Sequence, residues 1–204
     1  KGLLYPKSKI EYVAVDDSST DSTPKLLVKF GAKVIHVKTH DIELNKGIAM
    51  HVAKNELVYW MDADMEVCDK NFFKKLVKPL VENKEIIGSF TREFSLDCGD
   101  PVKNSFTRFI CHDDLQCDPT YSFFSTKVKD TIISQEKGYY ICKFLPTKIP
   151  PCGRTLYRRK ELLDTAVGNN KSFIDLETLE IVSRAGYQLF AFVPDAKIRH
   201  WHVD

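Results

Sequence analysis

The sequence predicts an α/β fold, in which a doubly wound and mainly parallel sheet is flanked by helices. Three observations lead to this class. Short apolar runs alternate along the chain with longer amphipathic stretches, glycines and prolines separate the two kinds of segment, and several of the apolar runs end in acidic residues. Alternation of strands and helices is typical of parallel sheets with crossover helices. The 204 residues are enough for one such domain.

Strands are expected where short runs rich in β-branched or aromatic residues end at turn-forming residues. Those predicted on this basis cover residues 10–15, 32–37, 56–61, 86–94, 155–157, 187–193 and 197–202. Helices are expected where apolar residues recur three or four positions apart. Those predicted run from Asp21 or Ser22 to Phe30, from just after Gly47 to Lys54, from Cys68 or Asp69 to Asn83, from Lys160 to about Val167, and from about Phe173 to Ala185.

Two of these helices carry clear local signals. The first has Pro24 in its first turn, where proline is tolerated, and Gly31 directly after its last residue. The helix that ends at Asn83 has an apolar stripe, formed by Phe72, Phe73, Leu76, Val77, Leu80 and Val81. This stripe is interpreted as core packing and needs no functional role.

The segment from about residue 97 to 148 differs from the rest of the chain. It is irregular, polar and cysteine-bearing, with weak periodicity. We interpret it as an insertion over the site rather than as a separate domain. At the amino end of the sequence, nothing before the strand at 10–15 could form a preceding strand and helix. Either the fold begins there, or the chain lacks a first βα unit.

Composition argues against several classes of function. The formal net charge is +2 and the basic residues are scattered, so nothing indicates binding to nucleic acid. No apolar run approaches the roughly 18 residues that span a bilayer, and the start of the chain lacks the features of a signal peptide. The six cysteines form no Cys-x-x-Cys pair, which favours reduced thiols in a cytoplasmic protein. The alternative is a metal site of Cys111, Cys117 and the nearby His112.

The most informative motif is Asp62-Ala63-Asp64, directly after the apolar run 57–61. A strand that ends this way places two carboxylates at the carboxyl edge of a sheet, where ligands bind in open α/β sheets. Carboxylate oxygens can hold a hard divalent cation, and the cation can hold phosphate. An acidic strand-to-loop turn is the structural alternative, because turns favour aspartate.

Two further strand ends support the functional interpretation. The strand at 10–15 runs into Asp16 and Asp17, and the last strand contains His200 and His202. Side chains alternate between the two faces of a strand, so the two histidines face the same side. Two imidazoles beside a pair of carboxylates are plausible metal ligands.

These motifs resemble the signatures of family-2 glycosyltransferases. Residues 15–23 are similar to the family's second-strand signature, and Asn45-Lys46-Gly47 is similar to the loop motif that follows it. Residues 56–65 resemble the strand that ends in the family's Asp-x-Asp motif. Residues 173–186 and 194–200 resemble its acceptor-side helix and its closing Pro-x-Ala-x-Val-x-His motif.

The resemblance extends over nearly the whole chain except about residues 97–148. It implies one GT-A domain over residues 1–204, with nucleotide bound by about 1–95 and acceptor by about 149–204. It also implies transfer of a sugar from a nucleoside diphosphate sugar to an acceptor hydroxyl. The family's opening strand has no match here, so we expect the native protein to be longer at its amino end.

The resemblance also implies roles for individual residues on the donor side. Asp17, with Asp16 beside it, would contact the base, and Asn45 and Lys46 would flank the base or the diphosphate. Asp62 would approach the ribose. Asp64 would bind Mn²⁺ or Mg²⁺, and His200 would be a further ligand or a diphosphate contact; His202 stays a metal candidate because it shares a face of the strand with His200. A divalent ion suits this chemistry, because the leaving nucleoside diphosphate develops negative charge. A UDP-sugar is favoured over a GDP-sugar as the donor.

The acceptor hydroxyl must lose a proton as it attacks, so the reaction needs a general base on the acceptor side. Asp175 and Glu177 are the candidates, at the start of the helix near Phe173. Members of the family usually carry adjacent Glu-Asp there, so the base is ambiguous between the two. Counting back from Gly186 favours Asp175. Because no side chain is recognisable as a covalent nucleophile, we expect the anomeric centre to be inverted.

Three arginines and the resemblance together suggest an acceptor and a location. Arg154, Arg158 and Arg159 are expected near the acceptor side, and many members of the family act on lipid-linked or polysaccharide acceptors at the cytosolic face of the membrane. Ordinary surface arginines are the alternative. Other functions that fit acidic strand ends are a sugar nucleotidyltransferase, a receiver-like signalling domain and a non-catalytic nucleotide-binding module.

Overall fold

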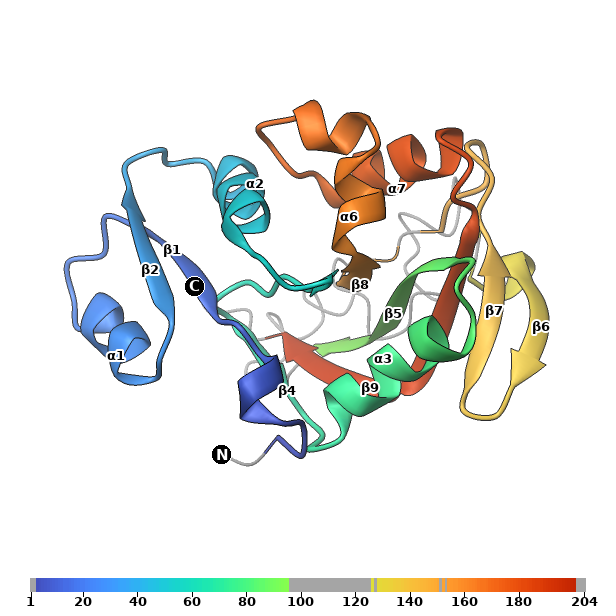
Figure 1. The fold of residues 1–204 in the computed structure, drawn as a ribbon, viewed down its shortest axis with the longest axis horizontal. Helices are drawn as coiled ribbons and strands as arrows, with labels where there is room; N and C mark the ends of the chain where they lie inside the picture. The colour runs from blue at the N-terminus through green and yellow to red at the C-terminus, as the bar shows by residue number, and fades with distance from the viewer. Residues whose placement is uncertain (1–2, 96–125, 127, 151, 153, 201–204) are drawn as a thin grey trace, which may run out of the picture.

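The computed structural model describes residues 3–95, 126, 128–150, 152 and 154–200, and this part of the chain forms two sheets (Figure 1). The smaller sheet pairs β1 (Val13–Asp17) in parallel with β2 (Lys33–Val37). Helix α1 (Thr23–Lys29) connects these two strands. In Figure 1 this βαβ unit lies on the left, beside the larger sheet.

The larger sheet is mixed. Its strands follow the order β3 (Leu57–Val58), β8 (Thr155–Arg158), β5 (Ile86–Ser95), β9 (Leu189–His200), β7 (Tyr139–Lys143) and β6 (Ile132–Glu136), and β4 (Met65–Val67) pairs with the last residues of β9. Of the described pairings in this sheet, β5 with β9 is parallel and the others are antiparallel. The α/β class is confirmed, while the sheet is less parallel than the sequence predicts, because short returning strands flank the β5–β9 pair.

Helices cover both faces of the larger sheet (Figure 1). Helix α3 (Phe72–Glu82) packs on one face, and α2 (Ile42–Val52), α6 (Arg159–Leu163) and α7 (Asp175–Arg184) contribute to a second core on the other. Short 3-10 turns are η1 (Lys7–Lys9), η2 (Val128–Thr131) and η3 (Ala166–Asn169). The architecture is therefore helix, sheet and helix in three layers.

The helices with the clearest local signals form as predicted. Helix α1 has Pro24 in its first turn, and Gly31, just beyond its end, has a positive φ of 86° that glycine adopts without strain. In α3 the buried residues include Phe72, Leu76 and Leu80, which confirms the predicted apolar stripe. Val81 is the exception, because its side chain is 64% exposed.

The strands differ from the prediction in three places. Residues 97–148 were expected to be irregular, but β6 and β7 form an antiparallel hairpin there, with Gly138 at a φ of 97° in the turn. The predicted strands 187–193 and 197–202 are one continuous strand, β9, whose register with β5 shifts where Val193 gives way to Lys197. The predicted strand 56–61 is shortened to β3, and β4 was not predicted.

Two arginines of β8 and α6 hold helix ends rather than a binding surface. The Arg158 guanidinium donates to the carbonyls of Leu80 and Asn83, at the end of α3, and to that of Ile86. Arg159 donates to the carbonyls of Met50 and His51, in the last turn of α2. The last carbonyls of a helix lack partners within it, so these side chains satisfy them. Both guanidinium groups are therefore engaged by backbone carbonyls, and the expected placement of Arg158 and Arg159 near an acceptor stays a prediction.

In the part of the chain that the structure describes, no helix combines the length and the apolar character needed to cross a bilayer. Cys142 and Cys152 are buried free thiols, and Cys68 is an exposed one. Burial raises the pKa of the Cys142 thiol to about 11. The alternative metal site of Cys111, His112 and Cys117 lies outside the described residues.

Candidate functional site

A series of polar contacts begins at the carboxyl end of β1. Asp17 accepts hydrogen bonds from the Thr39 backbone N–H (3.1 Å), the Thr39 hydroxyl (3.1 Å) and the Asn45 side-chain amide (3.1 Å). Burial acts to raise the pKa of Asp17, but the hydrogen bonds from Asn45 and Thr39 outweigh it and leave the pKa below its ordinary value. Asp17 is therefore a fixed anion at neutral pH, with its orientation set by its neighbours.

Asp16 does not join this group. It points to the other face of β1, its side chain is 4% exposed, and its carboxylate lies 3.1 Å from Nδ1 of His36 on β2. A hydrogen bond from Ser19 lowers the pKa of Asp16, and His36 acts in the same direction against the effect of burial. The alternation of side chains along a strand explains why adjacent aspartates separate in this way.

The next contact comes from α2, which begins earlier than the sequence predicts. The Asp41 carboxylate caps the helix by accepting from the N–H groups of Glu43 and Leu44, so Asn45 and Lys46 lie inside the first turns rather than in a loop before the helix. The Lys46 ammonium lies 3.9 Å from Asp62 and 3.2 Å from Glu43. Asn45 and Lys46 thus connect the end of β1 with Asp62.

Asp62 and Asp64 lie in the turn between β3 and β4, where the Met65 N–H donates to the Asp62 carbonyl at 3.2 Å. The Asp62 carboxylate also accepts from the Arg154 guanidinium at 2.6 Å. A second nitrogen of the same guanidinium lies 2.8 Å from the carboxylate of Asp175. One buried arginine therefore links the acidic turn to the beginning of α7.

Asp175 is held from a second direction. The indole N–H of Trp60 donates to its other carboxylate oxygen at 2.9 Å. Trp60 is itself fixed, because its ring stacks on buried Tyr157 with centroids 5.4 Å apart and contacts Phe173 edge-on at 4.4 Å. Glu177 is exposed on the first turn of α7. Of the two candidate bases, Asp175 is the one that the described contacts bring into the site.

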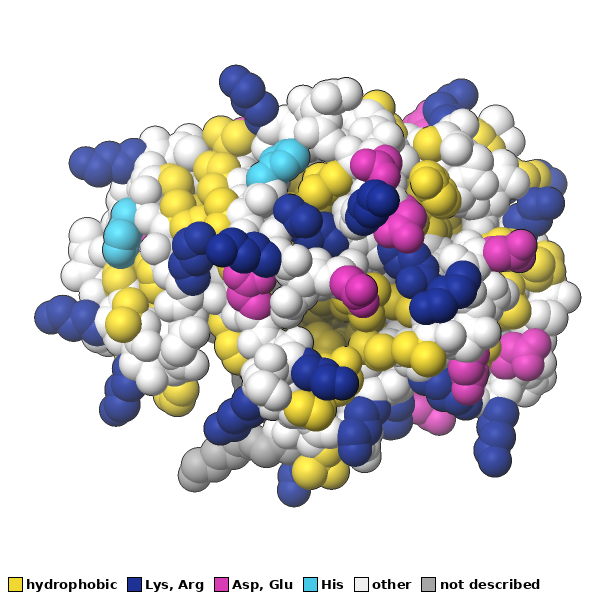
Figure 2. Space-filling model, in the orientation of Figure 1, with side chains coloured by type: hydrophobic (Ala, Val, Ile, Leu, Met, Phe, Trp, Pro, Cys, Tyr) yellow, Lys and Arg dark blue, Asp and Glu magenta, His cyan; other side chains and the backbone are white. Residues whose placement is uncertain are grey.

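Close backbone packing joins the two sides of the site. The Phe173 N–H donates to the Glu43 carbonyl at 2.9 Å, so α2 lies against the loop before α7. A Cβ atom at Gly47 would lie 2.0 Å from the carbonyl oxygen of Lys171. Only glycine permits this approach of α2 to the loop. Figure 2 shows basic and acidic side chains interspersed around a hollow near the centre of this face.

We call Asp17, Asn45, Lys46, Asp62, Arg154 and Asp175 the site network. Five of its members were predicted as substrate-binding or catalytic residues from the sequence, and the sixth, Arg154, was expected near the acceptor. The contacts of Thr39 and Trp60 were not predicted. A half-buried tryptophan needs a partner for its indole N–H. The place of Trp60 two residues before Asp62 was therefore the available signal that its N–H would donate to a residue of the site.

The predicted metal ligands are only partly described. Asp64 is half-buried, and the antiparallel pairing of β4 with β9 places the backbone of His200 opposite Met65. His202 and the side chain of His200 lie outside what the structure describes. Among the described side chains, no three histidines, cysteines or acids gather into a metal site. A carboxylate and an imidazole are nevertheless donor types that fit a divalent ion.

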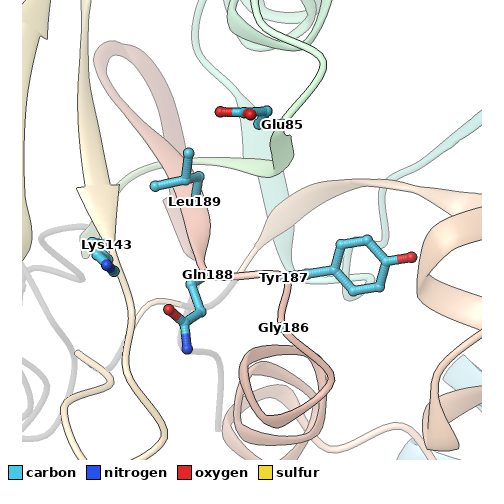
Figure 3. A pocket seen from close by; sticks show the side chains of 6 residues that line it. All are labelled: Glu85, Lys143, Gly186, Tyr187, Gln188 and Leu189. Carbon is cyan, nitrogen blue, oxygen red and sulfur yellow. The ribbon is translucent and has the colours of Figure 1, made fainter.

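Two hollows lie apart from the site network. One, of about 410 Å³, is lined by Glu85, Lys143 and residues 186–189, at the start of β9 and the opposite end of that strand from His200 (Figure 3). The other, of about 400 Å³, lies between α2 and η3 and includes Leu44, Ile48 and His51. Ligands of open α/β sheets bind at the carboxyl ends of the strands, which favours the network over the hollow of Figure 3.

Comparison with protein-family models gives a match to "Glycosyl transferase family 2" over residues 3–160. A search of curated proteins finds no match. The family match includes Asp17, Asn45, Lys46, Asp62 and Arg154 of the site network, but stops before α7.

Solved structures share the fold at low identity. S. aureus TarS 1–349 in complex with UDP-GlcNAc matches with a TM-score of 0.59 and 17% identity, over 98% of this chain and 52% of that one. GalNAc-T7 with UDP, GalNAc and Mn²⁺ matches with a TM-score of 0.60 and 16% identity, over 97% of this chain and 39% of that one. The mannosyltransferase PcManGT from Pyrobaculum calidifontis, in complex with GDP-Man and Mn²⁺, matches with a TM-score of 0.58 and 16% identity, over 97% of this chain and 49% of that one. The chain spans about half of the length of the TarS 1–349 chain, namely 52%.

Proposed function

The chain belongs to glycosyl transferase family 2 and has the GT-A fold, and from this we propose that it transfers a sugar from a nucleoside diphosphate sugar to an acceptor hydroxyl. One observation supports the proposal most strongly. Arg154 spans Asp62 and Asp175, which brings the expected donor-side and acceptor-side carboxylates to the two sides of a single guanidinium. Family membership decides against the receiver-like and nucleotidyltransferase alternatives.

We propose that the donor lies along the donor-side half of the site network. Asp17 would accept from the base while Asn45 holds its carboxylate in place, and Lys46 and Asp62 would face the diphosphate and the ribose. The solved relatives were captured with UDP-GlcNAc and with GDP-Man, so both bases occur on this fold. A UDP-sugar is our first choice and a GDP-sugar the second.

We propose a divalent ion, Mn²⁺ or Mg²⁺, as the cofactor. Asp64 would hold it, with His200 on the adjacent strand as the next candidate and His202 as a third. GalNAc-T7 and PcManGT were both captured with Mn²⁺. When bound, such an ion would neutralise charge on the leaving diphosphate. The Lys46 ammonium, 11% exposed, contributes positive charge at the same side of the site.

On the acceptor side, Asp175 is the proposed general base. The acceptor oxygen forms its bond to the anomeric carbon while the bond from that carbon to the diphosphate oxygen breaks, and the hydroxyl proton passes to Asp175. A single displacement of this kind inverts the anomeric centre. Trp60 and Arg154 fix both oxygens of Asp175, whereas Glu177 is exposed, which supports Asp175 over Glu177.

The acceptor itself is proposed from the surface around the base. Ile174 and Leu176, on either side of Asp175, are 46% and 40% exposed. Exposed aliphatic side chains beside a reacting group favour an acceptor with an apolar part. We therefore propose a lipid-linked acceptor at the cytosolic face of a membrane, with a polysaccharide acceptor as the alternative. Transfer to a lipid-linked acceptor in vesicles, reduced by Ile174→Ser and Leu176→Ser, would support this; equal transfer to a soluble polysaccharide would contradict it.

Calorimetry tests the donor and the metal together. UDP and GDP are titrated into the protein in Mn²⁺ and again in EDTA. Asp64→Ala should abolish the metal-dependent part of binding, and Asp62→Asn should weaken binding less. Asp195→Asn, an exposed acid on β9, is the matched control and should bind as the wild type does. Equal binding in Mn²⁺ and EDTA would contradict the metal role, and no binding of either nucleotide would contradict the donor.

A further inference from the structure

We propose that Arg154 is a positioning residue that fixes Asp175, the base of the proposed transfer, against Asp62 on the donor side. The inference rests on the proposed function for its kinetic consequences, but the contacts that carry it are independent of the reaction. It assigns Arg154 a role between the two halves of the site, so that donor and acceptor groups are aligned by the same side chain.

The contacts of the guanidinium carry this inference. Its two terminal nitrogens lie 2.6 Å from Asp62 and 2.8 Å from Asp175, and its Nε lies 2.8 Å from the sulfur of Met65. The side chain is only 10% exposed. A planar guanidinium presents its donors in a fixed fork, which a lysine ammonium cannot reproduce. The position of each carboxylate is therefore coupled to that of the other.

The backbone supports the same conclusion. Arg154 has a φ of 54°, in the left-handed region that residues with a Cβ rarely adopt. It stands directly before β8, where Thr155 and the residues after it are fixed by pairing with β5. Non-glycine residues with such backbone cluster at functional sites, where the surrounding structure holds them in place. Here this conformation accompanies a side chain directed at Asp62 and Asp175.

The neighbouring arginines show that this role is specific. Arg158 and Arg159 direct their guanidinium groups to backbone carbonyls at helix ends. Arg154 directs its guanidinium to two carboxylates on separate elements. A helix-end arginine affects the stability of its helix, whereas Arg154 affects the relative position of the donor-side carboxylate and the proposed base.

The test uses Arg154→Gly, because glycine adopts the positive φ freely and leaves space for a guanidinium ion from solution. The turnover number of the transfer should fall by about 10²-fold, the effect of a misplaced catalytic group. Millimolar guanidinium chloride should recover at least a tenth of the turnover that the substitution removes. Methylammonium should not recover it. Arg154→Lys should remain impaired. Arg184→Ala, an exposed arginine on α7, is the control and should respond to neither cation.

A stability measurement makes the test independent of activity. Urea unfolding of Arg154→Gly, Asp175→Asn and the double variant should give a midpoint shift for the double variant that is smaller than the sum of the single shifts, because both changes break the same contact. Additive midpoint shifts would overturn the inference. So would a folded Arg154→Gly variant that keeps wild-type turnover, or one whose reduced turnover guanidinium does not raise. A wild type without any transfer, but with the non-additive shifts, would instead count against the proposed function alone and support the positioning role.

Discussion

Replacing Gly47 by alanine tests whether the contact between α2 and the loop before α7 sets the geometry of the site. The new Cβ would lie 2.0 Å from the Lys171 carbonyl oxygen and 2.9 Å from its carbon, whereas ordinary contact begins at 3.4 Å. Both atoms belong to the backbone, so the loop itself must move. The loop leads directly into Asp175, which is therefore displaced from Lys46, Asp62 and Arg154.

The size of the effect follows from this displacement. Overpacking of this kind costs roughly 1–3 kcal/mol, and alanine in place of glycine inside a helix recovers about 1 kcal/mol. The net loss is about 0–2 kcal/mol, which for a chain of this length lowers Tm by at most roughly 8 °C. A misplacement of about 1 Å at a catalytic group costs about 10²-fold in turnover. Activity should therefore fall far more than stability.

Thermal unfolding and a transfer assay, run on the same preparations, check both numbers. Ile42→Ala is the control, because this side chain is 58% exposed on the same helix and stability should change little. A Gly47→Ala variant with wild-type Tm and wild-type turnover would refute the reasoning. A variant that loses stability but keeps its turnover would show that the contact between α2 and the loop is structural and does not position Asp175.

Three further predictions concern the reaction and the core. NMR of the anomeric proton of the product should show inverted configuration, and a retained configuration would contradict the single displacement. Burial raises the pKa of Cys142 from 9.0 to about 11, so the folded state keeps the thiol protonated. The stability that this thiol contributes is fully present below about pH 9 and is lost as the pH rises through about 11. Urea titrations of Cys142→Ala across that range should show a smaller loss than the wild type, and an equal loss would contradict the assignment. Arg159→Ala should lower Tm while leaving turnover within about twofold, because this side chain binds only the Met50 and His51 carbonyls in the described contacts; a large loss of turnover would contradict a purely structural role.

The sequence was most informative where a structural signal is local. Pro24 and Gly31 mark the beginning and the end of α1. The apolar stripe of α3 is buried because helical spacing alone determines which side chains share a face. The hairpin of β6 and β7 was missed because its residues are partly exposed and its stability comes from the pairing of β7 with β9. Pairing between segments far apart in the chain leaves little trace in local periodicity.

In the site, too, local motifs were predictable and contacts set by tertiary placement were not. Asp17, Asn45, Lys46, Asp62 and Asp175 come together as the motifs predicted, because strand ends and helix starts meet at one edge of the fold. The role of Arg154 was not predictable, since it depends on a positive φ and on the placement of β8 next to β5. The same tertiary placement separates it from Arg158 and Arg159, which look alike in the sequence. No spacing rule distinguishes these three arginines.

The most direct test of the proposed mechanism compares turnover in Asp175→Asn and Glu177→Gln, with donor binding measured in parallel by calorimetry. Asp175→Asn should lower the turnover number by roughly 10²- to 10⁴-fold, the usual contribution of a general base. Donor affinity should remain near that of the wild type, because Asp175 acts on the acceptor, and Glu177→Gln should stay active. Wild-type turnover in Asp175→Asn, or an inactive Glu177→Gln beside an active Asp175→Asn, would contradict the assignment of Asp175 as the base.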